Sequence, residues 1–212
     1  MIPGMFRDRL DAGKRLADAL AARVEEQAVV LGVPRGGVIV AAPVAARLGA
    51  ALDVVVPRKL RAPGNPELGI GAVAPGVEVL DDVVIARLGI DPAYLSREIA
   101  LEQAEVERRT IAYRVGRPPV ELAGRSAIVV DDGVATGGTA IAALRWARSA
   151  RPTLVVFAAP VGPASAVPRL RDEADDVVLL ETPRSFRAVG EWYATFDQTT
   201  DEEVRAALTA AS

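Results

Sequence analysis

The stretch Ser126-Ala-Ile-Val-Val-Asp-Asp-Gly-Val-Ala-Thr-Gly-Gly-Thr139 joins an aliphatic segment, two acids and a glycine turn. Residues 127–130 are aliphatic and mostly β-branched, which is typical of a central parallel strand that is covered on both faces. After the glycines, Ile141, Leu144 and Ala147 recur at helical spacing. The stretch therefore predicts a strand, a loop and a helix, in that order.

The loop between this strand and this helix has the composition of a phosphate site. The first N–H groups of a helix have no partner within the helix, and the helix dipole favours an anion there. Gly137 and Gly138 would let the backbone close around that anion, because a Cβ would obstruct its approach. Asp131 and Asp132 would repel it unless ribose hydroxyls or Mg²⁺ lie between them. We therefore expect a sugar phosphate whose hydroxyls face the two acids.

These residues also resemble a known motif. Four aliphatic residues, Asp131-Asp132, two variable residues and Ala135-Thr-Gly-Gly-Thr139 are similar to the phosphoribosyl-pyrophosphate (PRPP) motif of type I phosphoribosyltransferases. The alternative is an ordinary strand-to-helix turn whose glycines serve only packing. The resemblance implies that Asp131 and Asp132 hold the ribose hydroxyls, act in catalysis and hold Mg²⁺ indirectly, through those hydroxyls or water. It implies that the 5-phosphate is cradled by Ala135, Thr136, Gly137, Gly138 and Thr139.

A second glycine loop, Pro34-Arg35-Gly36-Gly37, follows an aliphatic strand at 28–33 and precedes an apolar helix at 38–48. In the family, a short loop after the first core strand binds pyrophosphate, and this loop resembles it. We therefore expect Arg35 to pair with phosphate oxygens in a fork geometry, and Gly36 and Gly37 to present backbone amides. The alternative is a generic turn that carries a surface arginine.

Arg58 and Lys59 follow the next predicted strand, at 52–56, and open a segment at 57–70 that is rich in Pro and Gly. Such a segment is long for a connection in a compact domain, so we expect a lid. The family carries a mobile loop over its active site in this part of the chain. The resemblance therefore implies that Arg58 binds pyrophosphate and that Lys59 both binds it and acts in catalysis. The alternative is a solvated pair of charges at the end of a strand.

The rest of the chain predicts an α/β protein. Strands near 28, 52, 127, 153 and 176, separated by helices, predict an open, doubly wound parallel sheet of the Rossmann-like phosphoribosyltransferase type. Other expected elements are an amphipathic helix at 5–25, an appended hairpin at 71–80, a charged helix from Pro92 to about 115, a Pro-interrupted helical stretch near 164–174 and a short helix at 204–210. In the charged helix, Ile111 is expected on the apolar side and Glu102 on the solvated side. Four aromatic residues in 186–196 are expected to cover the sheet edge rather than to stack on an acceptor ring.

Composition excludes several classes of function. The chain has 212 residues, no histidine and no cysteine, so catalysis would rest on carboxylates, cations, amides and a metal. Its 25 basic and 28 acidic residues are intermixed, which gives no field for nucleic acid. No apolar run approaches the length of a membrane span, and no secretory signal is readable at the start. We expect a single domain over 1–212 in the cytoplasm.

The resemblance implies a Mg²⁺-dependent transfer of ribose 5-phosphate from PRPP to a nitrogenous acceptor, with pyrophosphate displaced through an oxocarbenium-like transition state. Family members that act on 6-oxopurines carry an acid where this chain has Ala135, so a 6-oxopurine acceptor is disfavoured. A homodimer is implied by the same resemblance. Two alternatives are a non-catalytic sensor of PRPP or nucleotides on this fold, and a plain α/β interaction module. The paired acids and the two glycine loops disfavour the module.

Overall fold

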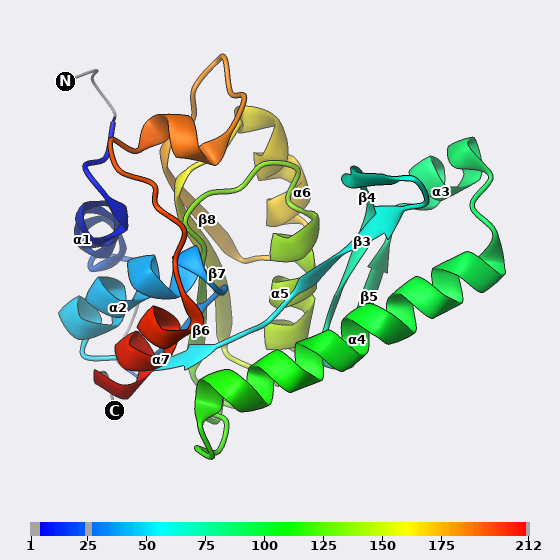
Figure 1. The fold of residues 1–212 in the computed structure, drawn as a ribbon. Helices are drawn as coiled ribbons and strands as arrows, with labels where there is room; N and C mark the ends of the chain where they lie inside the picture. Colours follow the sequence, from blue (N-terminus) through cyan, green and yellow to red (C-terminus); the bar gives the residue numbers. More distant parts are fainter. Residues whose placement is uncertain (1–4, 24–26, 211–212) are drawn as a thin grey trace.

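Five parallel strands form the centre of the protein in a computed structural model, which describes residues 5–23 and 27–210 (Figure 1). They lie side by side in the order β2-β1-β6-β7-β8. Their bounds are β1 (Ala28–Gly32), β2 (Ala51–Val54), β6 (Ser126–Val130), β7 (Leu154–Val161) and β8 (Asp176–Glu181). The expected doubly wound parallel sheet is therefore confirmed.

Helices cover both faces of this sheet, because alternate side chains of each strand point to opposite faces. In β6, Ile128 and Val130 pack against α1 (Arg9–Leu20), α2 (Gly36–Leu48) and α7 (Asp201–Ala210). On the other face, Ala127 and Val129 pack against α5 (Gly138–Ser149) and α6 (Val167–Arg171). None of the helices in the described ranges is long and apolar enough to span a membrane.

The first helix is shorter than the predicted range of 5–25. It begins at Arg9, because the Asp8 side chain accepts a hydrogen bond from the Asp11 N–H and so caps the helix. It ends at Leu20, and residues 24–26 lie outside the described part of the chain. The last helix begins at Asp201 instead of 204.

A second, smaller sheet lies to the side of the first, with α5 between them (Figure 1). Its antiparallel strands are β3 (Arg58–Ala62), β4 (Asn65–Ala74) and β5 (Val77–Leu80). The hairpin expected at 71–80 is confirmed as β4 and β5. The expected loop at 57–70 is wrong, because β3 and β4 form another hairpin there. Leu60 and Ala62 are buried while their neighbours are partly exposed, a short alternation that the surrounding Pro and Gly residues obscured.

The long helix α4 (Pro92–Arg114) crosses the outer side of this small sheet, after a short helix α3 (Asp82–Leu88) that the sequence interpretation missed. The predicted start of α4 is confirmed, with Asp91 as its cap. Its predicted faces are partly wrong. Glu102, expected in solvent, is 2% exposed, whereas Ile111, expected on the apolar side, is 66% exposed.

Candidate active site

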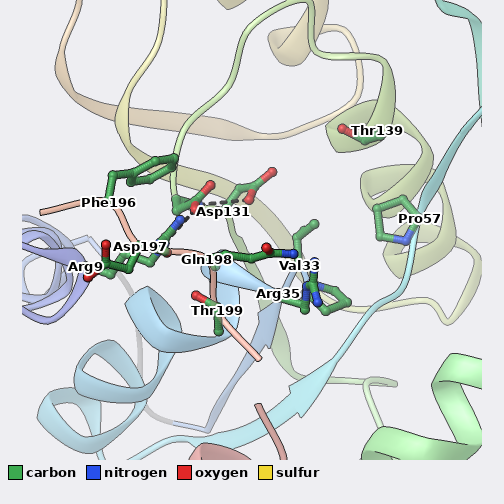
Figure 2. A pocket seen from close by; sticks show the side chains of 13 residues that line it. Arg9, Val33, Arg35, Pro57, Asp131, Thr139, Phe196, Asp197, Gln198 and Thr199 are labelled. Atoms are coloured by element: carbon green, nitrogen blue, oxygen red, sulfur yellow. Dashed lines mark hydrogen bonds and ion pairs between the residues drawn. The ribbon is translucent and has the colours of Figure 1, made fainter. Parts of the chain in front are cut away.

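The two glycine loops meet at the carboxyl ends of the parallel strands. The chain passes from β1 to β2 on one side and reaches β6 on the other, so the strand order reverses between β1 and β6. In open α/β sheets, ligands bind beyond the carboxyl ends of the strands at such a switch point. A pocket of about 490 Å³ lies there (Figure 2). It is lined by Arg9, Val33, Pro34, Arg35, Gly36, Pro57, Asp131, Asp132, Thr139, Phe196, Asp197, Gln198 and Thr199.

Asp131 and Asp132 stand at the end of β6 and line this pocket. The Asp132 N–H donates to Asp131 Oδ1 at 2.8 Å, which fixes the first carboxylate against the backbone of the second. Burial, and then the neighbouring Asp132 carboxylate, raise the pKa of Asp131 well above its ordinary value. Burial also raises the pKa of Asp132, against the opposing effect of the Arg9 guanidinium. The pocket therefore presents a pair of poorly hydrated acids, which hydroxyl donors or a cation would stabilise.

Arg9, which the sequence interpretation did not single out, contacts this acid pair. Its Nε lies 2.7 Å from Asp132 Oδ2, and one of its terminal nitrogens donates to the Asp197 carbonyl at 2.8 Å. The guanidinium also lies 3.8 Å above the centre of the Phe196 ring. Asp132 is 123 positions away along the chain, so no local pattern in the sequence signalled this contact.

The aromatic residues of the tail pack together at this end of the molecule. Phe196 has Arg9 on its ring and Tyr193 beside it, with the two ring centres 4.9 Å apart. Tyr193 packs in turn on Phe6 and donates its hydroxyl to the Asp132 carbonyl at 2.6 Å. Phe196 also lines the pocket, so its covering role stays a prediction.

The loop at 34–37 packs directly against the acids. A Cβ on Gly36 would overlap Asp132 Oδ2, and one on Gly37 would lie 2.7 Å from the Val130 carbonyl oxygen. These glycines therefore permit the close approach of the loops after β1 and β6, a reason that spacing alone did not reveal. Arg35 lines the pocket and forms a loose ion pair, at 3.9 Å, with Asp201. Among the described residues no side chain caps α2, and the Val38 N–H donates to the Arg35 carbonyl at 3.3 Å, so the N–H groups of Gly36 and Gly37 are the ones that a ligand could use.

The loop at 135–139 also lies at the carboxyl end of β6, before α5 begins. Ala135 and Thr136 are exposed, Gly137 has a left-handed φ of 83°, and Thr139 lines the pocket. A Cβ on Gly138 would meet nothing within 4 Å, so open space lies beside it. No side chain in the described part of the chain caps α5, so its first N–H groups have no side-chain partner.

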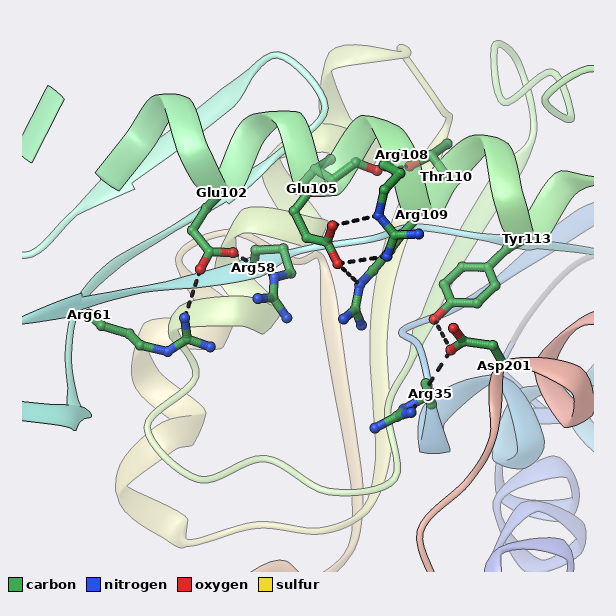
Figure 3. Close-up of polar contacts among 11 residues, drawn as sticks. Arg35, Arg58, Arg61, Glu102, Glu105, Arg108, Arg109, Thr110, Tyr113 and Asp201 are labelled. Carbon is green, nitrogen blue, oxygen red and sulfur yellow. Dashed lines mark hydrogen bonds and ion pairs between the residues drawn. The ribbon is translucent and has the colours of Figure 1, made fainter. Parts of the chain in front are cut away.

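Arg58 and Lys59 do not line the pocket in this structure. Both lie on β3, beyond Pro57. Arg58 donates to Glu102 at 2.6 Å, and Arg61 donates to the other oxygen of Glu102 at 2.8 Å (Figure 3). The Lys59 ammonium donates to the Glu67 carbonyl within the hairpin. The structure therefore brings Arg35, the acids and Thr139 together, whereas the pyrophosphate role of the β3 cations stays a prediction.

A magnesium ion fits the donor set if it arrives with a phosphate ligand. The described residues contain no group of three or more acidic, histidine or cysteine side chains that could hold a metal by themselves. The acidic residues that line the pocket are Asp131, Asp132 and Asp197, of which the first two are adjacent in the chain. Mg²⁺ in nucleotide-type sites is commonly bound by one or two carboxylates together with substrate phosphates. The residues present are compatible with that arrangement.

The chain is similar in sequence to known proteins. Residues 7–195 match a family model described as the phosphoribosyl transferase domain. A curated protein of Mycobacterium tuberculosis strain H37Rv, named "Putative phosphoribosyl transferase", is 47% identical over 205 residues. The match covers 96% of this chain and 46% of that protein, so the chain spans about half the length of the curated relatives it matches. A counterpart in strain CDC 1551 has the same identity and coverage.

Two solved structures resemble the fold of this chain. A crystal structure from Thermus thermophilus is similar with a TM-score of 0.82 and 46% identity, covering 98% of this chain and 99% of that one. A protein from Aquifex aeolicus has a TM-score of 0.50 and 14% identity, over 81% of this chain and 73% of that one. The second likeness concerns the fold alone.

Proposed function

Since the chain belongs to the phosphoribosyl transferase family, we propose that it binds PRPP with Mg²⁺ and transfers ribose 5-phosphate to a nitrogenous acceptor. In this reaction the bond between C1 of ribose and pyrophosphate breaks, a bond from C1 to the acceptor nitrogen forms, and that nitrogen loses a proton. The observation that carries the proposal is the convergence of both glycine loops and the acid pair on one pocket. A ligand with phosphates at two ends and hydroxyls between them matches that layout.

Each part of the pocket has a role in this proposal. The first turn of α5, with the loop at 135–139, would hold the 5-phosphate through backbone N–H groups. Asp131 and Asp132 would accept hydrogen bonds from the ribose hydroxyls. Arg35 and the start of α2 would bind the pyrophosphate, on which negative charge grows as it departs. Stabilising that charge is the main electrostatic task of the site.

Bound Mg²⁺ would neutralise part of the pyrophosphate charge. Asp131 and Asp132 are the residues that would hold the ion, through ribose hydroxyls or water, because they are the adjacent pair of acidic residues in the pocket lining. Lys59 would add a further cation if the β3–β4 hairpin brought it over the bound pyrophosphate. Ala135, which is exposed at the loop, supplies no carboxylate for proton handling at a purine, so we propose an acceptor other than a 6-oxopurine.

Calorimetry with PRPP, in the presence and absence of Mg²⁺, tests the binding step. We expect the double variant Asp131→Asn, Asp132→Asn to weaken PRPP binding by a few kcal/mol, since a hydrogen bond to a charged group contributes about 1.5–3 kcal/mol. Arg23→Gln is a matched control, because that arginine pairs with Asp176 at the surface. Unchanged affinity in the double variant would contradict the assignment of the acids to ribose.

A PRPP-sensing regulatory protein is the second candidate, and one observation favours it. Arg58 and Lys59 are held by Glu102 and by the Glu67 carbonyl, outside the pocket lining. Pyrophosphate release from PRPP, measured with a panel of bases and small amines, separates the two functions. Release with at least one acceptor supports the transferase, and tight PRPP binding without release across the panel supports the sensor.

A further inference from the structure

We propose that Arg9 is a positioning residue of the site, which holds Asp132 in the orientation that ribose binding requires. Arg9 lies at the start of α1, far in sequence from the glycine loops. The inference rests on the proposed function, because it takes Asp132 as a partner of the ribose hydroxyls. It concerns how the carboxylate is held, and Arg9 itself is not assigned a contact with the substrate.

Arg9 is held from several sides. Its side chain is 13% exposed, and its guanidinium contacts the Asp132 carboxylate, the Asp197 carbonyl and the Phe196 ring. The start of α1 is itself tied to the tail, because the Ala194 N–H donates to the Phe6 carbonyl at 2.8 Å. An arginine with three different partners on a fixed backbone has few alternative positions. The guanidinium is therefore preorganised rather than a loose surface charge.

The contact with Arg9 is made through one oxygen of Asp132. Oδ2 accepts from Arg9 Nε, and the carboxyl group also interacts with the Asp131 side chain. The single bond from Arg9 Nε holds Oδ2 in place, and the guanidinium itself is oriented by its hydrogen bond to the Asp197 carbonyl. The remaining oxygen of Asp132 would then face the pocket with a defined direction, available to a ribose hydroxyl.

Charge balance gives a second reason. Two adjacent carboxylates, close to a ligand with several phosphates, repel each other and the ligand. Arg9 is the cation that forms an ion pair with this acid pair in the described residues. Its charge offsets one carboxylate before any metal or substrate arrives. The electrostatic repulsion between the pocket and an incoming anion is then smaller.

The same contact reaches the loop at 34–37. A Cβ on Gly36 would overlap Asp132 Oδ2 and would lie 2.5 Å from Arg9 Nε, so the loop packs on the ion pair itself. Arg9, Asp132 and Gly36 are thus three neighbours in contact. Loss of the arginine would release the carboxylate and remove the surface against which the loop is placed. We therefore expect ribose and pyrophosphate binding to weaken together.

The test compares Arg9→Ala with Arg15→Ala, measuring PRPP affinity and, with an acceptor that turns over, kcat and KM. Arg15 is a matched control on the same helix: it pairs with Asp11 at 2.9 Å and lies 5.2 Å from the Phe6 ring, away from the acids. We expect Arg9→Ala to weaken PRPP affinity about ten- to a hundredfold, the effect of one charge-assisted hydrogen bond. KM should rise by more than kcat falls, and Arg15→Ala should resemble the wild type.

Chemical rescue separates positioning from a merely structural role. Millimolar guanidinium ion, far below denaturing concentrations, should restore part of the PRPP affinity of Arg9→Ala, whereas a general loss of structure would not respond. Arg9→Lys keeps the charge but loses one of the two donor nitrogens, so its PRPP affinity should be intermediate. If Arg9→Ala does not fold, the PRPP affinity of Arg9→Lys is the test of the inference. Wild-type or tighter PRPP binding by the folded Arg9 variants would overturn the inference alone. Absence of PRPP binding by the wild type would overturn the proposed function as well.

Discussion

Arg35 and Lys59 have similar surroundings in the sequence but different surroundings in the structure. Each comes after an aliphatic strand and a proline, yet Arg35 lines the pocket and Lys59 lies within an antiparallel hairpin. The difference comes from the connections of the two strands. After Arg35 a helix returns the chain to the parallel sheet, which keeps the loop at the ligand-binding edge. After β2 only residues 55–57 precede β3, so the chain leaves that sheet. The connection, rather than the charge, places a cation at the site.

Lys59→Ala tests whether the cation on the hairpin takes part in the reaction, and its expected effect is the largest. If the hairpin brings Lys59 over departing pyrophosphate, turnover should fall about a hundredfold while PRPP affinity falls only a few-fold. Arg35→Ala should lower affinity and turnover together, because Arg35 already lines the pocket. Single-turnover kinetics beside equilibrium binding measure both. Normal turnover by Lys59→Ala would show that the hairpin cation takes no part.

Removal of Glu102 tests what holds the hairpin against α4. Its carboxylate is buried and accepts from both Arg58 and Arg61. We expect Glu102→Ala to lower the free energy of unfolding by about 2 kcal/mol, less than for a fully buried pair because Arg61 is 40% exposed. Denaturant unfolding measures this, and Glu98→Ala is a milder control, since Glu98 accepts a single hydrogen bond, from the Arg61 N–H, among the described residues. Equal stability of both variants would mean that the buried pair does not anchor the hairpin.

Gly138→Val tests the loop at 135–139 as the site of the 5-phosphate. A Cβ there meets nothing within 4 Å, so the added methyl groups should fill the proposed phosphate cradle without disturbing the protein. We expect at least about tenfold weaker binding of ribose 5-phosphate, with stability changed by no more than about 1 kcal/mol. Gly138→Ala should have a smaller effect. Gly137→Val would be a poorer test, because a φ of 83° strains any residue with a Cβ. Normal phosphate binding by Gly138→Val would place the phosphate elsewhere.

The smallest effect is expected on the outer face of α4, where pH can be varied. Arg108 and Arg109 hold the pKa of Glu105 at about 2, below its ordinary value of 4.5. The carboxylate therefore contributes stability above about pH 4.5, and that contribution is lost as the pH falls towards 2. Because Arg108 is 61% exposed, we expect less than about 1 kcal/mol. The difference in unfolding temperature between wild type and Glu105→Gln should narrow as the pH falls below 4.5 and disappear only below about pH 2, and a constant difference would contradict the assignment.

Sequence patterns predicted those parts of the fold in which local periodicity and position along the chain determine the structure. The aliphatic runs predicted all five parallel strands, and the glycine loops at their ends predicted which segments meet. Glu102 and Ile111 were misplaced, because the α4 surface that is buried depends on the small sheet that packs on it. Arg9 was missed for a similar reason, since its partners are brought to it only by the tertiary fold.

The hydrogen bond from Arg9 to the Asp197 carbonyl joins residues 188 positions apart, and it has a kinetic consequence. Closing so long a segment costs more chain entropy than forming neighbouring strand pairs, so such contacts tend to form late in folding. The parallel sheet can be complete while the two distant segments that enclose the acids are still separate. Refolding should therefore restore the circular dichroism of the helices and sheet before it restores ligand binding, and the interval between them reports the joining of these two segments.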